Sequence, residues 1–212
     1  CIRDSYKSIW MDDGSPLRVY SQRVTDNLRS INHDVDFEFA MRYGNPSIRS
    51  GLEALKQRGV TDLLLLPMFP HYAQATTESS LKHAHLQLKA MNWSPNLLEM
   101  GHFETAEEFI GPLTESIRPH LSEDTHLLFS YHGLPVSHVK RIDRSKAHCQ
   151  TVEACCTVKC EANSLCYGRH CNETTMAVVE RLGLKPVQWS LSYQSRLGPV
   201  KWLEPSTTQM VE

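Results

Sequence analysis

The chain has 212 residues, which is enough for one large domain or for two small domains that each bury a core. Its 22 basic and 24 acidic residues nearly cancel, and no basic stretch is long enough to follow a phosphate backbone, which argues against a nucleic-acid partner. The longest apolar run, residues 63–69, is far shorter than the about 20 residues that cross a bilayer.

The first third of the chain predicts helices that alternate with strands. Ser15 and Pro16 are typical of a helix start, and apolar residues at intervals of three and four then predict a helix that runs to Ile31. Apolar spacing and alternation further predict a strand over residues 35–41, a helix over 48–55 and a fully buried strand over 63–66.

The same alternation continues to the end of the chain. It predicts a helix over residues 77–90, a strand over 97–100, a helix over 109–117, a buried strand over 125–129, a helix from about Asn172 to Leu182 and a strand over 187–192. Strands and helices that take turns throughout indicate an α/β fold, with parallel sheets covered by helices on both faces.

The turn-forming stretch 94–96 predicts a domain junction, with residues 1–96 in a first domain and 97–212 in a second. The chain begins at Cys1 without a signal segment, and residues 204–212 resemble the start of a helix. We therefore expect this sequence to be an excerpt from a longer chain.

The string SYHGLP, residues 130–135, places His132 where an apolar strand ends in a turn. Ligands of open α/β sheets bind at the carboxyl ends of the strands, and an imidazole exchanges protons near neutral pH because its free pKa is about 6.5. His132 is therefore a candidate catalytic residue. The alternative is a histidine that only caps the end of a strand.

Three further loops follow predicted strands and concentrate aromatic and cationic side chains. They span residues 41–46, 66–80 and 192–205, and they carry Tyr43, Phe69, Tyr72, Tyr193 and Trp202 with Arg42 and Arg196, while Tyr131 precedes His132. Parallel strands bring such loops to one edge, where they suit a large flat ligand that carries carboxylates. The alternative is that these aromatic residues complete a core.

Six of the seven cysteines fall between Cys149 and Cys171, with the spacing C-x5-C-C-x3-C-x5-C-x4-C. This segment, at about residues 145–171, interrupts the α/β pattern and is predicted to be an insertion. Crowded thiols without a secretion signal favour a thiolate-bound metal over disulfides, and four ligands suffice for zinc or for a [2Fe-2S] cluster. His148 and His170 flank the cysteines and are further candidates.

Four motifs in this order, MRYGNPSI, LPMFPHYAQATT, SYHGLP and SYQSRLGPVKWLEP, resemble the ferrochelatase family. The resemblance implies two similar Rossmann-like domains of the chelatase type, with four-stranded parallel sheets and a porphyrin cleft between them. It further implies a lyase that inserts ferrous iron into protoporphyrin IX. By the same resemblance His132 is the catalytic base or the ligand of the substrate iron, and Arg42 contacts a porphyrin propionate. The expected substrate-binding residues are Arg42, Tyr43, Tyr72, Tyr131, Ser192, Gln194 and Trp202.

The resemblance extends to the cysteines, because some bacterial members hold a [2Fe-2S] cluster in an internal insertion at this point. The expected ligands are Cys149, Cys156, Cys166 and Cys171, with Cys155 and Cys160 as alternatives. Adjacent cysteines do not readily bind one iron without strain. The animal-type arrangement is excluded, since the chain has Gln74 where one of its ligands would lie. Zinc remains the alternative cofactor.

One departure from the family pattern and two other candidate functions complete the expectations. The family's second catalytic residue, a glutamate, lies beyond the WLEP stretch, so we expect this excerpt alone to be inactive. The other candidate functions are a cobalt chelatase of another tetrapyrrole and a non-catalytic module that senses iron or redox state. The expected location is the cytoplasm with peripheral association at the inner membrane. Coproporphyrin in place of protoporphyrin, and the oligomeric state, stay open.

Overall fold

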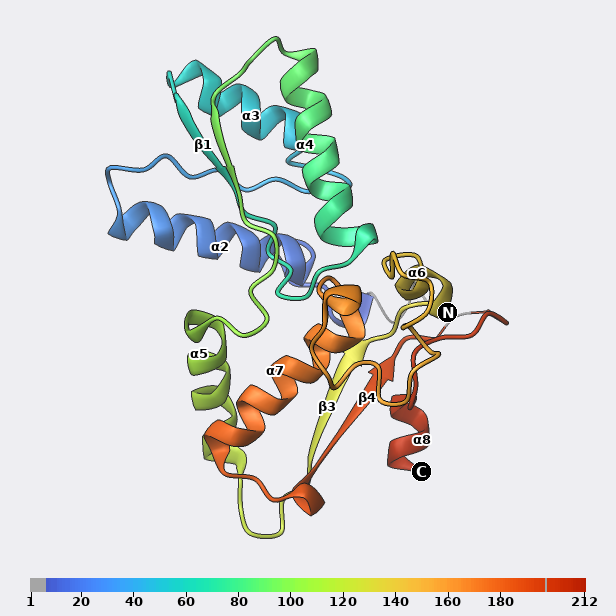
Figure 1. Cartoon of the computed structure of the whole chain (residues 1–212). Helices are drawn as coiled ribbons and strands as arrows, with labels where there is room; N and C mark the ends of the chain where they lie inside the picture. The colour runs from blue at the N-terminus through green and yellow to red at the C-terminus, as the bar shows by residue number, and fades with distance from the viewer. Residues whose placement is uncertain (1–6, 197) are drawn as a thin grey trace. The chain divides into compact units, whose positions relative to one another are not determined.

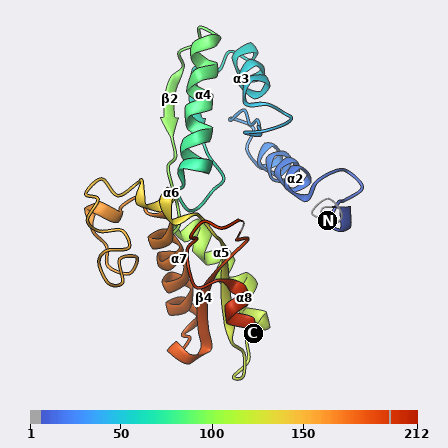
Figure 2. The ribbon, with the colours of Figure 1, turned by 90° about the vertical axis from the view of Figure 1, so that its right-hand side faces the viewer.

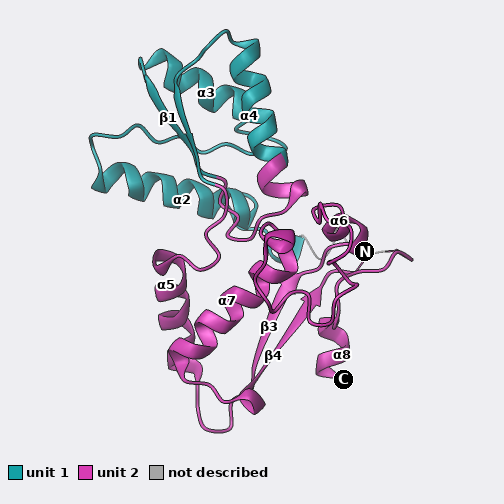
Figure 3. Ribbon diagram, viewed as in Figure 1, with its two compact units in different colours: residues 1–66, 79–100 teal, residues 67–78, 101–212 magenta. Residues whose placement is uncertain are grey.

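The computed structural model describes residues 7–196 and 198–212, so the start of the first predicted domain and Leu197 of the loop 192–205 lie outside the described residues. The chain divides into two compact units (Figure 3). Unit 1 comprises residues 1–66 and 79–100, and unit 2 comprises residues 67–78 and 101–212. The loop 67–78, which carries Tyr72, therefore belongs to the same unit as His132.

Unit 1 contains all but one of the helices and strands that the apolar spacing predicts in its part of the chain. They are α2 (Pro16–Ile31), α3 (Ile48–Gln57), β1 (Asp62–Leu65), α4 (Ser79–Ala90) and β2 (Asn96–Glu99). The hydroxyl of Ser15 accepts a hydrogen bond from the Arg18 amide at 3.3 Å, and that of Ser47 does the same for Ser50 at 3.1 Å, so both helices begin at side-chain caps.

Strands β1 and β2 pair in parallel, with Leu63 opposite Leu97. Leucines of α3 and α4 cover one face of this pair, and α4 lies beside β2 in Figure 2. The other face carries Leu64, which is 55% exposed. The strand is thus where the sequence predicts it, but the prediction that it is buried on both faces is wrong.

The predicted strand over residues 35–41 is also wrong. The segment forms no ladder, and Met41 alone makes an isolated bridge, to Ser47. The carbonyl of Phe37 instead accepts hydrogen bonds from the Arg29 guanidinium at 2.7 and 3.0 Å. Alternating apolar and polar side chains suit a segment for a sheet, but a strand forms only beside another strand. In the described part of the chain no strand runs beside this segment.

Unit 2 is built around a second parallel pair. Its elements are a π-helical turn (Gln74–Glu78), α5 (Glu107–Ile117), β3 (Leu127–His132), α6 (Val136–Lys140), α7 (Tyr167–Leu182), β4 (Trp189–Gln194) and α8 (Thr207–Val211), with short 3₁₀ turns at Arg118–His120, Glu161–Asn163 and Pro186–Gln188. Helix α7 lies along β3 and β4 in Figure 1, and α5 contacts α7.

The register of β3 and β4 decides which side chains share a face. His132 is opposite Gln194, and Tyr131 is opposite Tyr193. Tyr131 and Tyr193 belong to the core that includes Cys171 of α7, whereas Ser192 hydrogen-bonds Thr207 of α8. Helices therefore cover both faces, which confirms an α/β fold with parallel sheets flanked by helices. Each described sheet has two strands, where the resemblance implies four.

Helix α7 begins five residues earlier than predicted. Its first residue is Tyr167 rather than a residue near Asn172, and Cys166 is the cap. The start of α7 is not recognisable from the sequence, because the cysteines and the glycine in this stretch are not preferred helix formers. The end is typical, since Gly183 adopts the left-handed conformation with φ 67°.

Among the described residues, no helix is both long enough and apolar enough to cross a bilayer.

We predict that the leucine core of unit 1 carries its stability. Replacing Leu52, which is 4% exposed, with alanine should lower the free energy of unfolding by about 2–4 kcal/mol through lost burial and the cavity left behind. The matched control Leu17→Ala, at a position that is 70% exposed, should change it by less than about 0.5 kcal/mol. Denaturant unfolding followed by circular dichroism measures both, and equal effects would contradict this assignment of the core.

Candidate active site and cysteine cluster

His132 is the last residue of β3, and its side chain is exposed at the carboxyl end of the strand. The next residue, Gly133, donates its amide to the Gln194 carbonyl at 2.7 Å. A Cβ at Gly133 would lie 2.8 Å from that same oxygen, so only glycine permits the close approach. The backbone therefore turns away directly after His132 and leaves its imidazole at the edge.

A second contact holds the backbone of His132. The Tyr167 hydroxyl donates a hydrogen bond to the His132 carbonyl at 2.8 Å. Tyr167 is the first residue of α7, so the helix that covers the β3–β4 pair also reaches the end of β3. The peptide that carries His132 is thus held from both sides.

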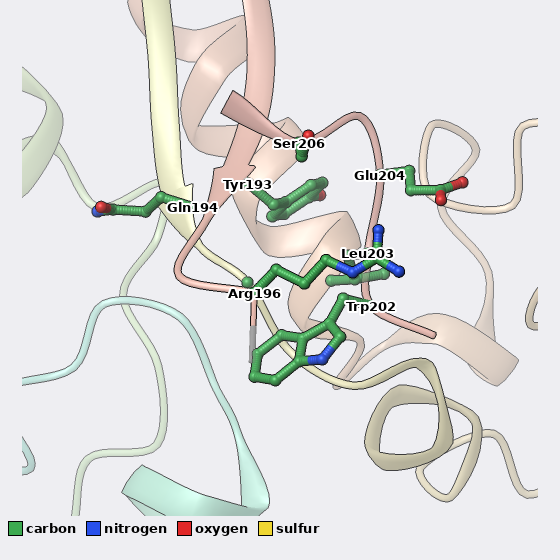
Figure 4. A pocket seen from close by; sticks show the side chains of 8 residues that line it. Tyr193, Gln194, Arg196, Trp202, Leu203, Glu204 and Ser206 are labelled. Carbon is green, nitrogen blue, oxygen red and sulfur yellow. The ribbon is translucent and has the colours of Figure 1, made fainter. Parts of the chain in front are cut away.

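A small cavity lies beside this edge, between β4 and the segment that follows it. Its volume is about 10 Å³, room for about one water molecule, and it is lined by Gly133, Tyr193, Gln194, Arg196, Trp202, Leu203, Glu204 and Ser206. Figure 4 shows the Arg196 side chain above the Trp202 ring, while Gln194 points away from both. This cavity is too small for a macrocycle, so a large ligand would have to bind over the edge that exposes His132.

The loop that carries Tyr72 is fixed to α7. The Tyr72 amide donates to His170 Nδ1 at 3.1 Å, and its hydroxyl donates to Glu78 at 2.9 Å. Burial, followed by the bond to Glu78, raises the pKa of Tyr72 to about 12. The Tyr72 phenol is therefore neutral and committed to Glu78 in this structure.

His71 is fixed to the same helix. Its Nε2 lies 2.9 Å from Thr174 Oγ1, which itself donates to the Glu104 carbonyl, so His71 must be the donor to Thr174. Burial and then the nearby His170 lower the pKa of His71 to about 4. His71 is therefore held neutral by its surroundings.

His102, Glu104 and His170 form a group whose ligand atoms lie within 4.8 Å of one another. However, His170 Nδ1 accepts the Tyr72 amide, which places the proton on Nε2, and this nitrogen donates to the Ser164 carbonyl at 2.9 Å. His170 has no lone pair left for a metal. This group therefore joins the loop 70–72 to the cysteine segment and is not a metal site in this arrangement.

Two predicted substrate-binding residues are engaged inside unit 2. The Tyr131 hydroxyl lies 2.8 Å from Thr175 Oγ1 of α7, and burial raises its pKa. Ser192 is fully buried and bonds the Phe129 carbonyl and Thr207. Both side chains therefore lie in the interior of unit 2 and not at the exposed edge that carries His132.

The other two predicted contacts, Arg42 and Tyr43, belong to unit 1. Arg42 donates to Ser79 Oγ at 2.8 Å, and its guanidinium lies 4.5 Å from the centre of the Tyr43 ring. Tyr43 is 76% exposed. Together they present a cationic and aromatic pair on the surface of that unit.

The cysteine segment is organised by one carboxylate. Asp143 accepts hydrogen bonds from the amides of Cys149 at 2.8 Å, His148 at 2.9 Å and Ser145 at 3.0 Å, and from the Ser145 hydroxyl at 2.6 Å. These donors, the Cys149 amide first, hold the pKa of Asp143 well below its usual range. Asp143 therefore fixes the backbone position of Cys149, the first cysteine of the segment.

Three of the thiols are joined by hydrogen bonds. Cys155 and Cys156 have sulfurs 3.8 Å apart, and Cys156 is hydrogen-bonded to Cys166. The Gln150 amide donates to the Cys155 sulfur at 3.5 Å. Cys149 and Cys171 lie with Cys166 in one buried core cluster, and Cys156 packs against it. Burial, followed by Cys166 and Cys155, raises the pKa of Cys149 to about 11.

Cys166 has the character of a metal-binding thiolate. Its pKa is lowered by the hydrogen bond from Cys156 and by the amides of Arg169 and Gly168, at the start of α7. A Cβ at Gly168 would lie 3.0 Å from the Cys156 sulfur, so the glycine leaves room for the thiols. Amides that point at sulfur stabilise an anionic centre.

The Cys160 sulfur is 3.7 Å from His148 Nε2, whose ring is also bonded to the Cys155 carbonyl. Cys171 is completely buried, burial raises its pKa, and its thiol contacts Tyr167. The packing thus places both Cys155 and Cys171 beside the Cys156–Cys166 pair, whereas Cys160 contacts His148.

The sequence analysis missed Asp143 and Tyr167. The Asp-x-Ser pattern at residue 143 is a recognisable Asx turn, and its position before the first cysteine is a usable signal. Tyr167 carries no such signal, because its bond to His132 joins residues 35 positions apart.

Comparison with known proteins decides the family. The sequence model of the ferrochelatase family matches residues 2–212. The chain belongs to the ferrochelatase family. A ferrochelatase of Pseudomonas syringae pv. syringae is 36% identical over 204 residues, which cover 96% of this chain and 60% of that protein.

Two other ferrochelatases are equally similar. The protein of Bdellovibrio bacteriovorus is 37% identical over 212 residues, covering 99% of this chain and 62% of that protein, and the protein of Pseudomonas aeruginosa strain LESB58 is 37% identical over 204 residues, covering 96% and 60%. The chain thus spans about 60% of the length of the ferrochelatases that it matches.

We predict that the neutral state of His71 makes unit 2 sensitive to acid. The pKa of about 4 in the folded state lies below the ordinary value of 6.5, so the unfolded chain binds the proton more readily. The stability that neutral His71 confers is complete above about pH 6.5, and on the order of 2–3 kcal/mol is lost as the pH falls toward 4.

Chemical unfolding at a series of pH values measures this loss. The variant His71→Gln keeps an N–H donor for Thr174 but has no proton to gain, so its unfolding should depend less on pH over this range. Some dependence should remain, because the pKa of His170 is also lowered by burial. An unchanged slope in the variant would show that His71 is not the group that titrates.

Proposed function

We propose that the complete natural protein containing this chain is a ferrochelatase that inserts ferrous iron into protoporphyrin IX, with His132 as the catalytic residue. One observation carries the proposal. In a chain of this family, His132 lies exposed at the carboxyl end of a parallel strand, and contacts on both sides hold its peptide. The side chain itself makes no hydrogen bond to the other described residues, so its imidazole is available to a substrate.

The chemistry requires such a group. A porphyrin loses two pyrrole protons when a metal enters, and a base within hydrogen-bond reach of the ring centre accepts them. A flat macrocycle also hides its nitrogen lone pairs, so aromatic walls that hold the ring bent lower the barrier. His132 supplies the base or the first ligand of the substrate iron, and Trp202 lies at the same edge to supply part of the wall.

The other substrate contacts belong to the same proposal. Arg42, stacked on Tyr43, suits a propionate, because a guanidinium pairs with a carboxylate through two parallel hydrogen bonds. Gln194 is opposite His132 in the register and is also exposed. Tyr131 and Ser192 bond α7 and α8 in the interior of unit 2 and thereby support the strands. Tyr72 belongs to the loop whose backbone His170 holds.

We further propose that the cysteine segment holds a [2Fe-2S] cluster through Cys149, Cys156, Cys166 and Cys171, with Cys155 and Cys160 as alternatives. The donor set fits, since these four thiols pack in one core cluster, Cys166 favours the thiolate, and the amides of Gly168 and Arg169 point at its sulfur. Such a cluster supplies a one-electron redox centre with visible absorption. Zinc with the same ligands is the alternative.

The remaining parts of the proposal concern organisation and location. Residues 1–96 are proposed as part of the first chelatase domain and residues 97–212 as part of the second, with the cysteine-rich insertion at about 145–171. The compact units differ from these bounds, because the loop 67–78 belongs to unit 2 and unit 1 extends to residue 100. The protein is cytoplasmic and meets its porphyrin at the inner membrane surface. Cobalt chelation is disfavoured, because the similar proteins are named ferrochelatases.

We predict that His132→Ala lowers iron insertion by the complete protein at least 100-fold, since general base catalysis contributes about 10²–10⁴-fold. Stability should change little, because the ring is exposed. The matched control is His138→Ala, an exposed histidine of α6, which should keep full activity. Haem formation from ferrous iron and protoporphyrin is measured anaerobically. A His132→Ala enzyme within threefold of the natural rate would refute the assignment.

We predict that Cys156→Ser and Cys166→Ser abolish the visible absorption and the bound iron of the purified protein, whereas Cys160→Ser retains both. The Cys160 sulfur lies against His148, and the four proposed ligands pack in one core cluster. Iron analysis, absorption and electron paramagnetic resonance of the reduced protein measure the outcome. Retention with Cys171→Ala and loss with Cys155→Ser would show that Cys155 is a ligand in place of Cys171. A colourless protein that contains one zinc ion would show that zinc occupies this site in place of the cluster.

A further inference from the structure

We propose that Tyr167 is a positioning residue for His132, and that through Tyr167 the cysteine segment sets the orientation of His132. The inference deepens the proposed function and rests on it for the catalytic role of His132. The observation behind it is a single hydrogen bond, from the Tyr167 hydroxyl to the His132 carbonyl at 2.8 Å, at the point where β3 ends.

The carbonyl of His132 needs this partner. In a parallel ladder successive residues direct their N–H and C=O groups to opposite sides, and the amide of Gly133 is directed at β4. The carbonyl of His132 is therefore directed away from β4, where the described sheet has no third strand. Tyr167 supplies the hydrogen bond that a neighbouring strand would otherwise supply.

Tyr167 is well suited to hold a fixed position. It is half-buried, and its hydroxyl donates to the His132 carbonyl at 2.8 Å. Its ring meets that of His71 edge to face, with centroids 5.9 Å apart, and its hydroxyl also contacts the Cys171 thiol. The donor is thus fixed by packing on more than one side.

The orientation of His132 depends on its backbone. The imidazole is exposed and makes no hydrogen bond to the other described residues, so the peptide on either side decides where the Cα–Cβ bond points. Proton transfer requires heavy atoms about 2.6–3.2 Å apart, and a catalytic group displaced by about 1 Å loses much of its effect. A bond that fixes the 132–133 peptide therefore acts on the reaction without touching the substrate.

The same residue connects His132 with the cysteines. Tyr167 follows Cys166 directly, and the amides of Gly168 and Arg169 are bonded to the Cys166 sulfur. The first turn of α7 therefore carries the Cys166 thiol on one side and the donor to His132 on the other. A change in what Cys166 binds alters the first turn of α7 and with it the support of His132.

Tyr167→Phe in the complete protein tests the positioning role, because it removes the hydroxyl and keeps the ring. We expect kcat to fall three- to tenfold, while KM for porphyrin stays within twofold. The direct readout is NMR of protein labelled with ¹³C in the histidine rings, where the His132 signal, assigned by its loss in His132→Ala, should shift or broaden. The matched control, Tyr20→Phe on the exposed side of α2, should change neither quantity.

The two readouts separate the inference from the function on which it rests. An unchanged His132 signal in Tyr167→Phe overturns the positioning role, even if His132→Ala is inactive. A shifted His132 signal with a fully active His132→Ala enzyme overturns the proposed function and leaves the structural coupling intact. Loss of folded protein is detected by circular dichroism, and then the same NMR measurement is made on Tyr167→His, which keeps a ring N–H donor.

A second pair of variants tests the link to the cysteines. Cys166→Ala should reproduce the change in the His132 signal, whereas Cys160→Ala should leave the signal in place, since Cys160 lies against His148 and not at the start of α7. A His132 signal that is identical in Cys166→Ala and in the natural protein would overturn the link, and would limit the role of Tyr167 to local support.

Discussion

The buried face of α7 is the constraint on which the rest of unit 2 depends, because four of its polar side chains each hold a specific partner in another segment. Thr174 holds His71, His170 holds the Tyr72 amide, Thr175 holds Tyr131, and Tyr167 holds the His132 carbonyl. One helix therefore fixes both the loop before the π-helical turn and the strand that ends at His132. A hydrophobic face would bury as much surface, but it would not set the register of the loop against the strand, since apolar contacts have no preferred direction.

Such a face is stable only when its groups are satisfied together. Arg169 is buried in the same helix, and it pairs with both oxygens of Glu173, at 2.7 and 2.8 Å, and donates to the Asn163 carbonyl. Breaking one partner of a buried network leaves an unpaired polar group, which costs more than the bond contributed. The cysteine segment is attached to this network through Asn163, Ser164 and Cys166, so its conformation and the support of the candidate site are parts of one arrangement.

Much of the fold follows from local pattern. The helices α2, α3 and α5 and the four strands lie close to where apolar spacing, caps and alternation predict them, because these signals arise within a few residues of each other. The prediction of a strand over residues 35–41 is wrong, since pairing depends on a second strand, which the sequence of this segment does not specify. The edge position of His132 was predictable for the same reason as the strands, because the glycine and proline that follow it mark where the ladder ends.

The sequence by itself determined the α/β class, the family motifs, the histidine at the strand end and the concentration of thiols, all of which are properties of neighbouring residues. The tertiary structure alone decided which thiols meet, that Tyr131 and Ser192 are directed inward, and that Tyr167 supports His132. These contacts join residues far apart in the chain, and they depend on the angle at which α7 crosses the β3–β4 pair. Side-chain direction across such a distance is set by packing, which no periodicity within one segment encodes.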